Sequence, residues 1–110
     1  MIKKTMKEIK ARLKQKGAVT DKSKADLLTL LSKLETEIDK LSKTHSEHAE
    51  SITGFIERSA HEATRQKKQP QLLKISLSGL SESVKGFEAS HPSLVENINE
   101  VCTVLANMGV

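Results

Sequence analysis

The sequence contains no tryptophan and no tyrosine, and it has only two phenylalanines, two prolines and one cysteine among 110 residues. A core with so few aromatic rings must be built from Leu, Ile, Val and Ala, which favours packed helices. Two prolines and five glycines supply too few turn residues for a β-sandwich or barrel. One cysteine excludes an internal disulfide and fits a reducing compartment. We therefore expect a single all-helical domain over residues 1–110.

Long apolar runs are also missing. No stretch approaches the roughly 20 residues that span a bilayer, and the basic start has no continuous apolar segment of the kind found in secretory signals. We therefore expect a cytoplasmic protein. A Gly-rich phosphate loop, a paired acidic dyad and a Ser-His-Asp arrangement are not recognisable either. We expect a protein that is not an enzyme and that needs no cofactor.

The positive charge is concentrated at the start of the chain. The net charge is +4, but residues 1–24 alone carry +7, so the remaining residues carry −3. Charge pairing within the molecule or between subunits is the preferred interpretation, and nucleic acid or an anionic membrane is the alternative. Lysine predominates over arginine and aromatic stacking platforms are absent, which makes base recognition weak. The candidates for surface binding are Lys3, Lys4, Lys7, Lys10, Arg12, Lys14 and Lys16.

The apolar residues recur at intervals of four and three, a spacing that predicts amphipathic helices. One set predicts a helix over residues 2–16, ended by Gly17, and a second predicts a helix over 22–43. No proline occurs between Asp21 and Gln69, so this second helix could continue to residue 67. Gly54 and the polar stretch 44–46 favour instead a break into 22–43 and 46–67. The two apolar sets are Ile2, Met6, Ile9 and Leu13, then Leu27, Leu31, Leu34, Ile38 and Leu41.

The same spacing continues beyond Pro70, which discourages helix before it and marks a boundary. It predicts helices over 71–88 and 92–108, with Pro92 tolerated in a first turn. A stripe of small residues, Ser76, Gly79, Ser83 and Gly86, predicts close approach of a neighbouring helix. The expected architecture is a bundle of three to four helices with coiled-coil-like packing. A basic helix and a long helical region would occupy 1–69, and a helical hairpin 70–110.

The C-terminal part carries a recognisable pattern. It reads Phe-Glu-Ala-Ser-His-Pro-Ser-Leu over residues 87–94 and Leu-Ala-Asn-Met-Gly-Val over residues 105–110. This combination resembles a small bacterial domain family of unknown function. The resemblance implies a helical, cytoplasmic bacterial protein, and it brings no activity, because none is assigned to the family. Residues 45–69 form a longer stretch than the family usually carries.

The chemically active side chains are few. His45 and His48 share a helix face and His61 follows, so these three are candidate metal ligands, since catalytic zinc uses three protein ligands and an open position. Polar residues at seam positions more often set helix register, and we prefer that role.

Cys102 lies beside an apolar stripe and is expected to be inert. The segment between the last two predicted helices is interpreted as a structural corner made by Phe87, Ser90, His91 and Pro92. There the His91 imidazole could hold Glu88 or the preceding helix end.

Small helical domains with little aromatic content bury few large side chains. Four short helices with two phenylalanines can barely close a core within one chain, so we expect the chain to self-associate as a structural or protein-interaction module. The partner is a second copy or another protein. Weak binding to an anionic surface through the lysine-rich first helix is the alternative, and metal binding by histidine ranks below it.

Overall fold

Five helices account for nearly all of the chain that the computed structural model describes, which comprises residues 2–15 and 21–108. They are α1 (Ile2–Gln15), α2 (Asp21–Ser42), α3 (Ser46–Thr64), α4 (Pro70–Ser83) and α5 (Pro92–Met108). These described ranges contain no strand, which confirms the all-α prediction. The radius of gyration is 13.0 Å, close to the value of about 13 Å for a compact 100-residue domain.

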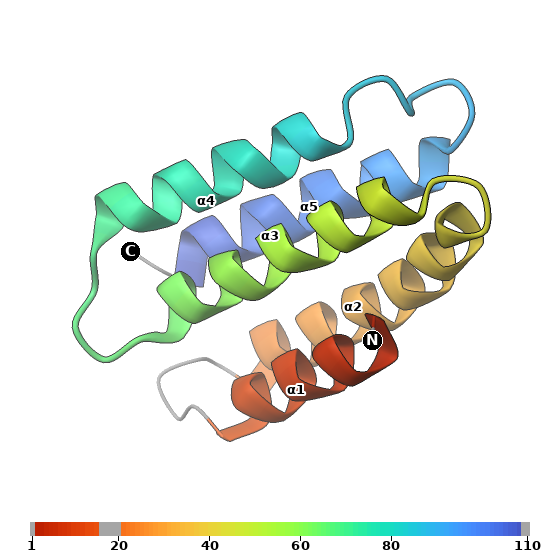
Figure 1. Cartoon of the computed structure of the whole chain (residues 1–110). Helices are drawn as coiled ribbons and strands as arrows, with labels where there is room; N and C mark the ends of the chain where they lie inside the picture. The colour runs from red at the N-terminus through yellow and green to blue at the C-terminus, as the bar shows by residue number, and fades with distance from the viewer. Residues whose placement is uncertain (1, 16–20, 109–110) are drawn as a thin grey trace.

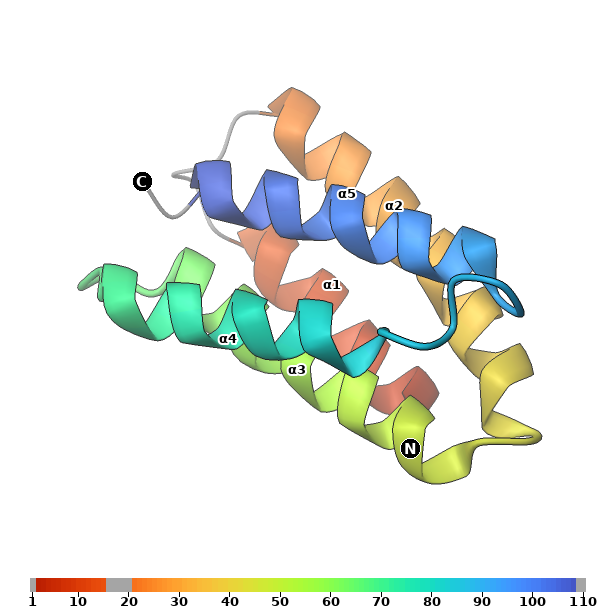
Figure 2. The ribbon, with the colours of Figure 1, turned by 90° about the horizontal axis from the view of Figure 1, so that it is seen from above.

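The helix α3 lies at the centre and contacts each of the other four helices. The helix α4 lies along α3, while α5 lies along α2, as both ribbon views show (Figure 1, Figure 2). The helix α1 packs against α2 and α3. The turn between α2 and α3 and the longer connection between α4 and α5 meet at the same end of the molecule (Figure 1). This topology brings residues 43–48 and 84–91 close together although they are distant in sequence.

One hydrophobic core draws side chains from every helix. In α1, Met6, Ile9 and Leu13 are at most 3% exposed. The apolar set predicted for α2 is buried, and so are Leu94, Ile98, Val101 and Leu105 of α5, as the spacing predicts. The expectation that a single chain barely closes its core is therefore wrong. Five helices do so with aliphatic side chains, and any self-association must use surface residues.

The predicted count of three to four helices is also wrong, since the described residues form five, but the favoured break between residues 43 and 46 is confirmed. Ser42 ends α2, and the backbone N–H of His45 donates to the Leu41 carbonyl at 2.8 Å. Residues 22–67 therefore form two helices and not one. The second ends at Thr64, short of the predicted residue 67. There the Lys68 ammonium donates to the Ala63 carbonyl and satisfies one acceptor at the helix end.

The helix predicted over 71–88 ends early, at Ser83. Gly86 has a φ of +96°, a left-handed conformation that glycine adopts without a steric penalty. Val84 and Phe87 continue the apolar spacing and are buried, but they lie in the connection after the helix. Close packing is confirmed at Gly79, where an added Cβ would lie 2.4 Å from Cε1 of Phe55 on α3. Gly86 belongs to the turn and not to the packed stripe.

The remaining predictions concern helix ends. The last helix, α5, has the predicted bounds, and the His91 carbonyl accepts from the Val95 N–H at 3.3 Å. The predicted stop at Gly17 lies outside the described residues. Among the helices that are described, none is long and apolar enough to cross a membrane. Coiled-coil-like packing stays a prediction.

Candidate interaction surface

The basic face of α1 is the first candidate. Its apolar stripe is docked on the bundle, and Lys3, Lys4, Lys7 and Lys14 are exposed around it. Two other predicted cations are already engaged: Lys10 pairs with Glu35 on α2 at 3.0 Å, and Arg12 donates to Nδ1 of His61 on α3 at 2.7 Å. Lys16 lies outside the described residues. Four of the seven predicted cations thus form a solvated lysine face.

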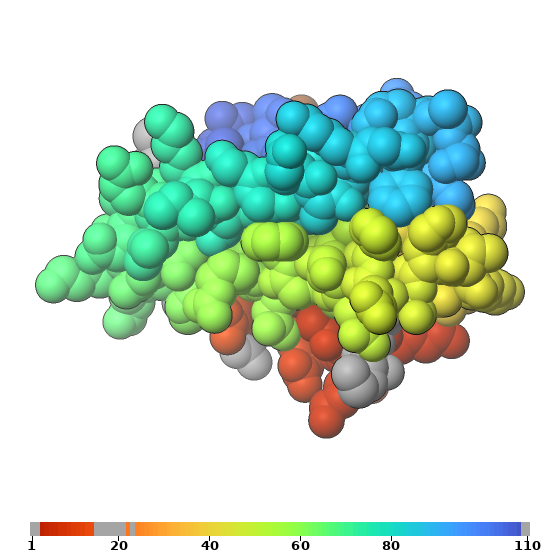
Figure 3. Space-filling view, turned by 45° about the horizontal axis from the view of Figure 1, so that its top comes forward, coloured from red at the N-terminus to blue at the C-terminus, as the bar shows by residue number. Residues whose placement is uncertain are grey.

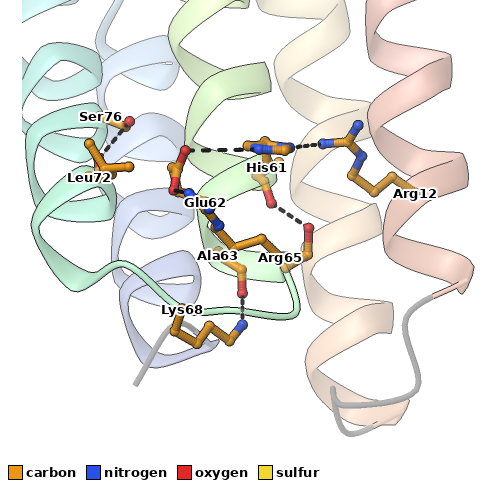
Figure 4. Close-up of polar contacts among 10 residues, drawn as sticks. Arg12, His61, Glu62, Ala63, Arg65, Lys68, Leu72 and Ser76 are labelled. Atoms are coloured by element: carbon orange, nitrogen blue, oxygen red, sulfur yellow. Dashed lines mark hydrogen bonds and ion pairs between the residues drawn. The ribbon is translucent and has the colours of Figure 1, made fainter.

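Arg12 begins a chain of polar contacts that crosses from α1 to the end of α3 (Figure 4). A guanidinium only donates, so His61 accepts at Nδ1 and carries its proton on Nε2 when neutral. That Nε2 lies 4.0 Å from Oε2 of Glu62, a carboxylate whose side chain is only 4% exposed. Arg65 pairs with the other oxygen of Glu62 at 2.9 Å. The charge of Glu62 is therefore compensated where α3 ends.

A pocket of about 150 Å³ lies between α1 and α3 next to this chain of contacts. Its lining mixes both charge signs, with Glu8 and Glu57 beside Arg12 and Arg58. Such a mixture suits internal charge compensation better than selection of an anionic ligand. His61 thus connects α1 to α3.

The other three histidines gather around Phe87 at the opposite end of α3. Ring centroids of His45 and His48 lie 5.4 and 5.3 Å from that of Phe87, and the His91 ring lies 5.8 Å from it, all edge to face. His45 and His48 are 6.0 Å apart. These geometries are typical of favourable aromatic pairs. The cluster joins the α2–α3 turn to the α4–α5 connection.

The structure therefore separates the predicted metal candidates: His45 and His48 share one cluster, and His61 binds Arg12 elsewhere. No group of three or more His, Cys, Asp or Glu side chains in residues 2–15 and 21–108 has the arrangement to hold a metal ion. Sequence reasoning did not find the approach of His45 and His48 to Phe87. The sequence indicated only a structural corner at Phe87, Ser90, His91 and Pro92, and it gave no indication of which other residues would contact that corner.

Within the corner, Ser90 Oγ and His91 Nδ1 share a hydrogen bond of 3.0 Å. The Glu88 carboxylate accepts from the Gly86 N–H at 2.8 and 3.1 Å. The His91 N–H donates to the Phe87 carbonyl at 2.8 Å, and α5 starts at Pro92. His91 thus contacts Phe87 and Ser90, while Glu88 stabilises the glycine turn.

Cys102 is the only cysteine and packs against the core from α5. Burial raises the pKa of its thiol, because a thiolate is poorly solvated there. The thiolate is the nucleophilic form, so this environment makes Cys102 less reactive at neutral pH. The geometry agrees with a packing role.

An exposed apolar surface on α3 and α4 is the last candidate, and the sequence did not predict it. Three large hydrophobic side chains are exposed on α3 and α4: Phe55 at 38%, Leu72 at 44% and Ile75 at 66%. Leu72 and Ile75 are three residues apart and share one face of α4, and the Phe55 ring lies against Gly79, one turn beyond Ile75. We call Phe55, Leu72 and Ile75 the α3–α4 patch; the two helices form the green and cyan surface of Figure 3.

Within the described residues, the chain is thus a small domain of five helices with three exposed large hydrophobic side chains on α3 and α4. The chain belongs to the family described as Domain of unknown function (DUF4404), whose model matches residues 52–110. The match confirms the resemblance drawn from the C-terminal pattern, and it covers most of α3 with all of α4 and α5. Neither the curated proteins nor the solved structures gave a match to the chain.

Proposed function

We propose that this protein is a non-enzymatic, self-associating interaction module that pairs with a second copy through the α3–α4 patch. The observation that carries the proposal is the exposure of Leu72, Ile75 and Phe55 in a chain whose other large hydrophobic side chains, within the described residues, are at least partly covered. Contiguous apolar surface on a small protein commonly marks an interaction site. The partner is the same surface on a second chain.

The charges along α4 support an antiparallel pair. Lys74 and Glu82 are exposed and stand eight residues apart on the outer face of α4, with Ser78 midway between them. A two-fold axis crossing near Ser78 would place Lys74 of each copy opposite Glu82 of the other, since such an interface is self-complementary. Glu82 now pairs with Lys85 at 2.9 Å, but both side chains are 69% exposed. Exposed pairs of this kind exchange partners at little cost.

Sedimentation of the full chain tests the proposal. A dissociable dimer of the 12.1 kDa chain is expected at micromolar concentrations, because a one-helix contact is small. Ile75→Glu should weaken dimerisation by at least about tenfold, and Thr36→Glu, on the exposed surface of α2, should leave it unchanged. A monomer at every concentration would disprove the proposal.

Charge reversal supplies the sharper test. Lys74→Glu alone and Glu82→Lys alone should each weaken the dimer, because each places like charges opposite one another. The double variant should restore it. Two single variants that behave as the original chain would show that α4 does not pair in this orientation.

We also infer a second, weaker role in binding anionic surfaces through the lysine face of α1. Its support is the exposure of Lys3, Lys4, Lys7 and Lys14, and each lysine near an anionic membrane contributes on the order of 1 kcal/mol. The buried stripe leaves no apolar anchor for insertion, so binding would be salt-sensitive. Co-sedimentation with anionic and neutral vesicles tests it: equal, negligible binding to both would exclude the role.

A further inference from the structure

An apolar groove runs between α4 and α5, on the flank of α4 that faces away from the α3–α4 patch. The helix α4 packs chiefly on α3 and α5 packs chiefly on α2, and α4 and α5 also contact each other. The groove has a volume of about 640 Å³, within the range of roughly 300–1,000 Å³ for small-molecule sites. Its residues are Lys68, Pro70, Leu73, Lys74, Leu77, Ser78, Ser81 and Ala106.

The floor of the groove is aliphatic. Leu73, Leu77 and Ala106 lie along it, and its lining on α4 extends from Pro70 to Ser81. At a rise of 1.5 Å per residue this is a length of roughly 16 Å. An apolar surface of this length can accommodate an extended hydrocarbon chain.

The charged residues that line the groove within the described part of the chain are of one sign. Lys68 and Lys74 lie at its edge, and none of the eight lining residues is acidic. Lys74 is exposed, while the Lys68 ammonium also donates to the carbonyl of Ala63 at the end of α3. An ammonium offers three donors, so Lys68 retains donors for a second partner. An anionic head group would therefore find two ammonium groups beside the apolar floor.

We propose that the groove binds a long-chain fatty acid, with its carboxylate at Lys68 and Lys74 and its hydrocarbon tail along Leu73, Leu77 and Ala106. None of the three residues of the α3–α4 patch lines the groove, so the inference goes beyond self-association, but Lys74 and Ser78 belong both to the groove and to the proposed α4 pairing. The test therefore uses variants outside that pairing. Charge complementarity selects an anionic amphiphile over a neutral one, and the length of the groove accommodates an extended chain. Binding adds no chemistry: the ligand is held, not converted.

Calorimetric titration of the full chain with palmitate, below its micelle concentration, tests the proposal. Saturable binding is expected, whereas a cationic amphiphile of equal chain length should bind at least about tenfold more weakly, because its head group meets two lysines. Lys68→Glu, which lies outside the proposed α4 pairing, should weaken palmitate binding to a similar extent. Lys40→Glu, on the exposed surface of α2, is the matched control and should bind as the original chain does.

Ala106→Trp is a second variant and should block the tail by filling the groove, with thermal unfolding followed to show that it remains folded. If it unfolds, Ser81→Trp, an exposed residue in the groove lining on α4, takes its place. Ile75→Glu should bind palmitate normally, which separates this site from the dimer surface.

Absence of saturable binding would overturn the proposal, as would equal affinity for both head groups. Loss of self-association in Ala106→Trp would also overturn it, because the groove would then be an interface between copies. Capture of anionic vesicles without binding of free palmitate would assign the lipid contact to the lysines of α1 instead.

Discussion

Two ion pairs with the same three-residue spacing differ in their value for stability, because one is buried and the other is not. The Glu62 side chain is 4% exposed and pairs with Arg65 at 2.9 Å, whereas Glu82 and Lys85 are each 69% exposed. Removing one partner of a buried pair leaves a charge without compensation. Exposed pairs contribute little, even though Glu82 raises the pKa of Lys85.

Arg65→Ala should therefore lower the free energy of unfolding by about 1–3 kcal/mol, a value reduced from that of a fully buried pair because the Arg65 side chain is 30% exposed. Lys85→Ala should leave it without a measurable change. Urea denaturation of the monomeric chain compares the two. Equal losses would contradict the assignment of Glu62 as a buried carboxylate that needs its partner.

The glycines permit a second comparison. Gly86 has φ +96° with no atom within 4 Å of the position that a Cβ would take, and Gly54 lies in the exposed interior of α3 with equal free space. Gly86→Ala should destabilise by about 1 kcal/mol because an L side chain resists the left-handed conformation. Gly54→Ala should stabilise by up to about 1 kcal/mol through helix propensity. Thermal unfolding of both variants gives the signs, and the same sign for both would contradict the backbone argument.

At the scale of single residues, the sequence predicts burial better than it predicts contacts. The four-and-three spacing locates Met6, Ile9 and Leu13 correctly in the core, since a helix repeats its faces locally. The approach of His45 and His48 to Phe87 depends on which helix ends meet in space. That information is contained in the topology and not in the local pattern.

For the helices, the apolar spacing predicts which side of a helix is buried better than it predicts the residue at which the helix ends. The apolar spacing that predicts 71–88 continues through Val84 and Phe87, but α4 ends at Ser83 and Gly86 turns the backbone away from the helical path. Buried residues can keep a helical spacing across a connection when the chain doubles back on the same core. The break at residues 43–45 was favoured by local polarity, which lowers helix propensity.

The helix α1 offers a test at this scale, because its role can be structural or ligand-binding. A chain that begins at Thr20 loses Met6, Ile9 and Leu13, three side chains at most 3% exposed. Burial of each contributes roughly 1.5–3 kcal/mol, and the sum approaches the total stability of a small domain, about 5–15 kcal/mol. We expect the truncated chain to lose cooperative thermal unfolding, as followed by circular dichroism.

A second variant serves as the control for the truncated chain. It keeps the apolar residues of α1 and removes part of the positive charge of that helix. Replacing Lys3, Lys4 and Lys7 together by Gln should leave thermal unfolding nearly unchanged, since these side chains are exposed, while it weakens any binding to anionic vesicles. An unchanged melting temperature in the truncated chain, together with loss of strong vesicle binding, would show that α1 is a membrane-binding arm and not a part of the core.

For the whole molecule, the region matched by the family model is shorter than the set of helices that pack into one core. The match to the family model starts at Ile52, inside α3, but α3 and α5 both pack against α2. The apolar residues Leu94, Ile98, Val101 and Leu105 of α5 are at most 1% exposed in the full chain. Without α1 and α2, part of this surface would be open to water.

A fragment comprising residues 46–110 should therefore fail to fold cooperatively by itself, although it contains the whole family match. Its amide spectrum is expected to be poorly dispersed and its thermal transition broad, which are the signs of helices without fixed packing. Adding a separate fragment of residues 1–45 should restore a dispersed spectrum, because the α2–α5 and α2–α3 contacts would form again. If residues 46–110 alone unfold cooperatively at the melting temperature of the full chain, then α3, α4 and α5 are the true folding unit, and the first two helices are an addition to it.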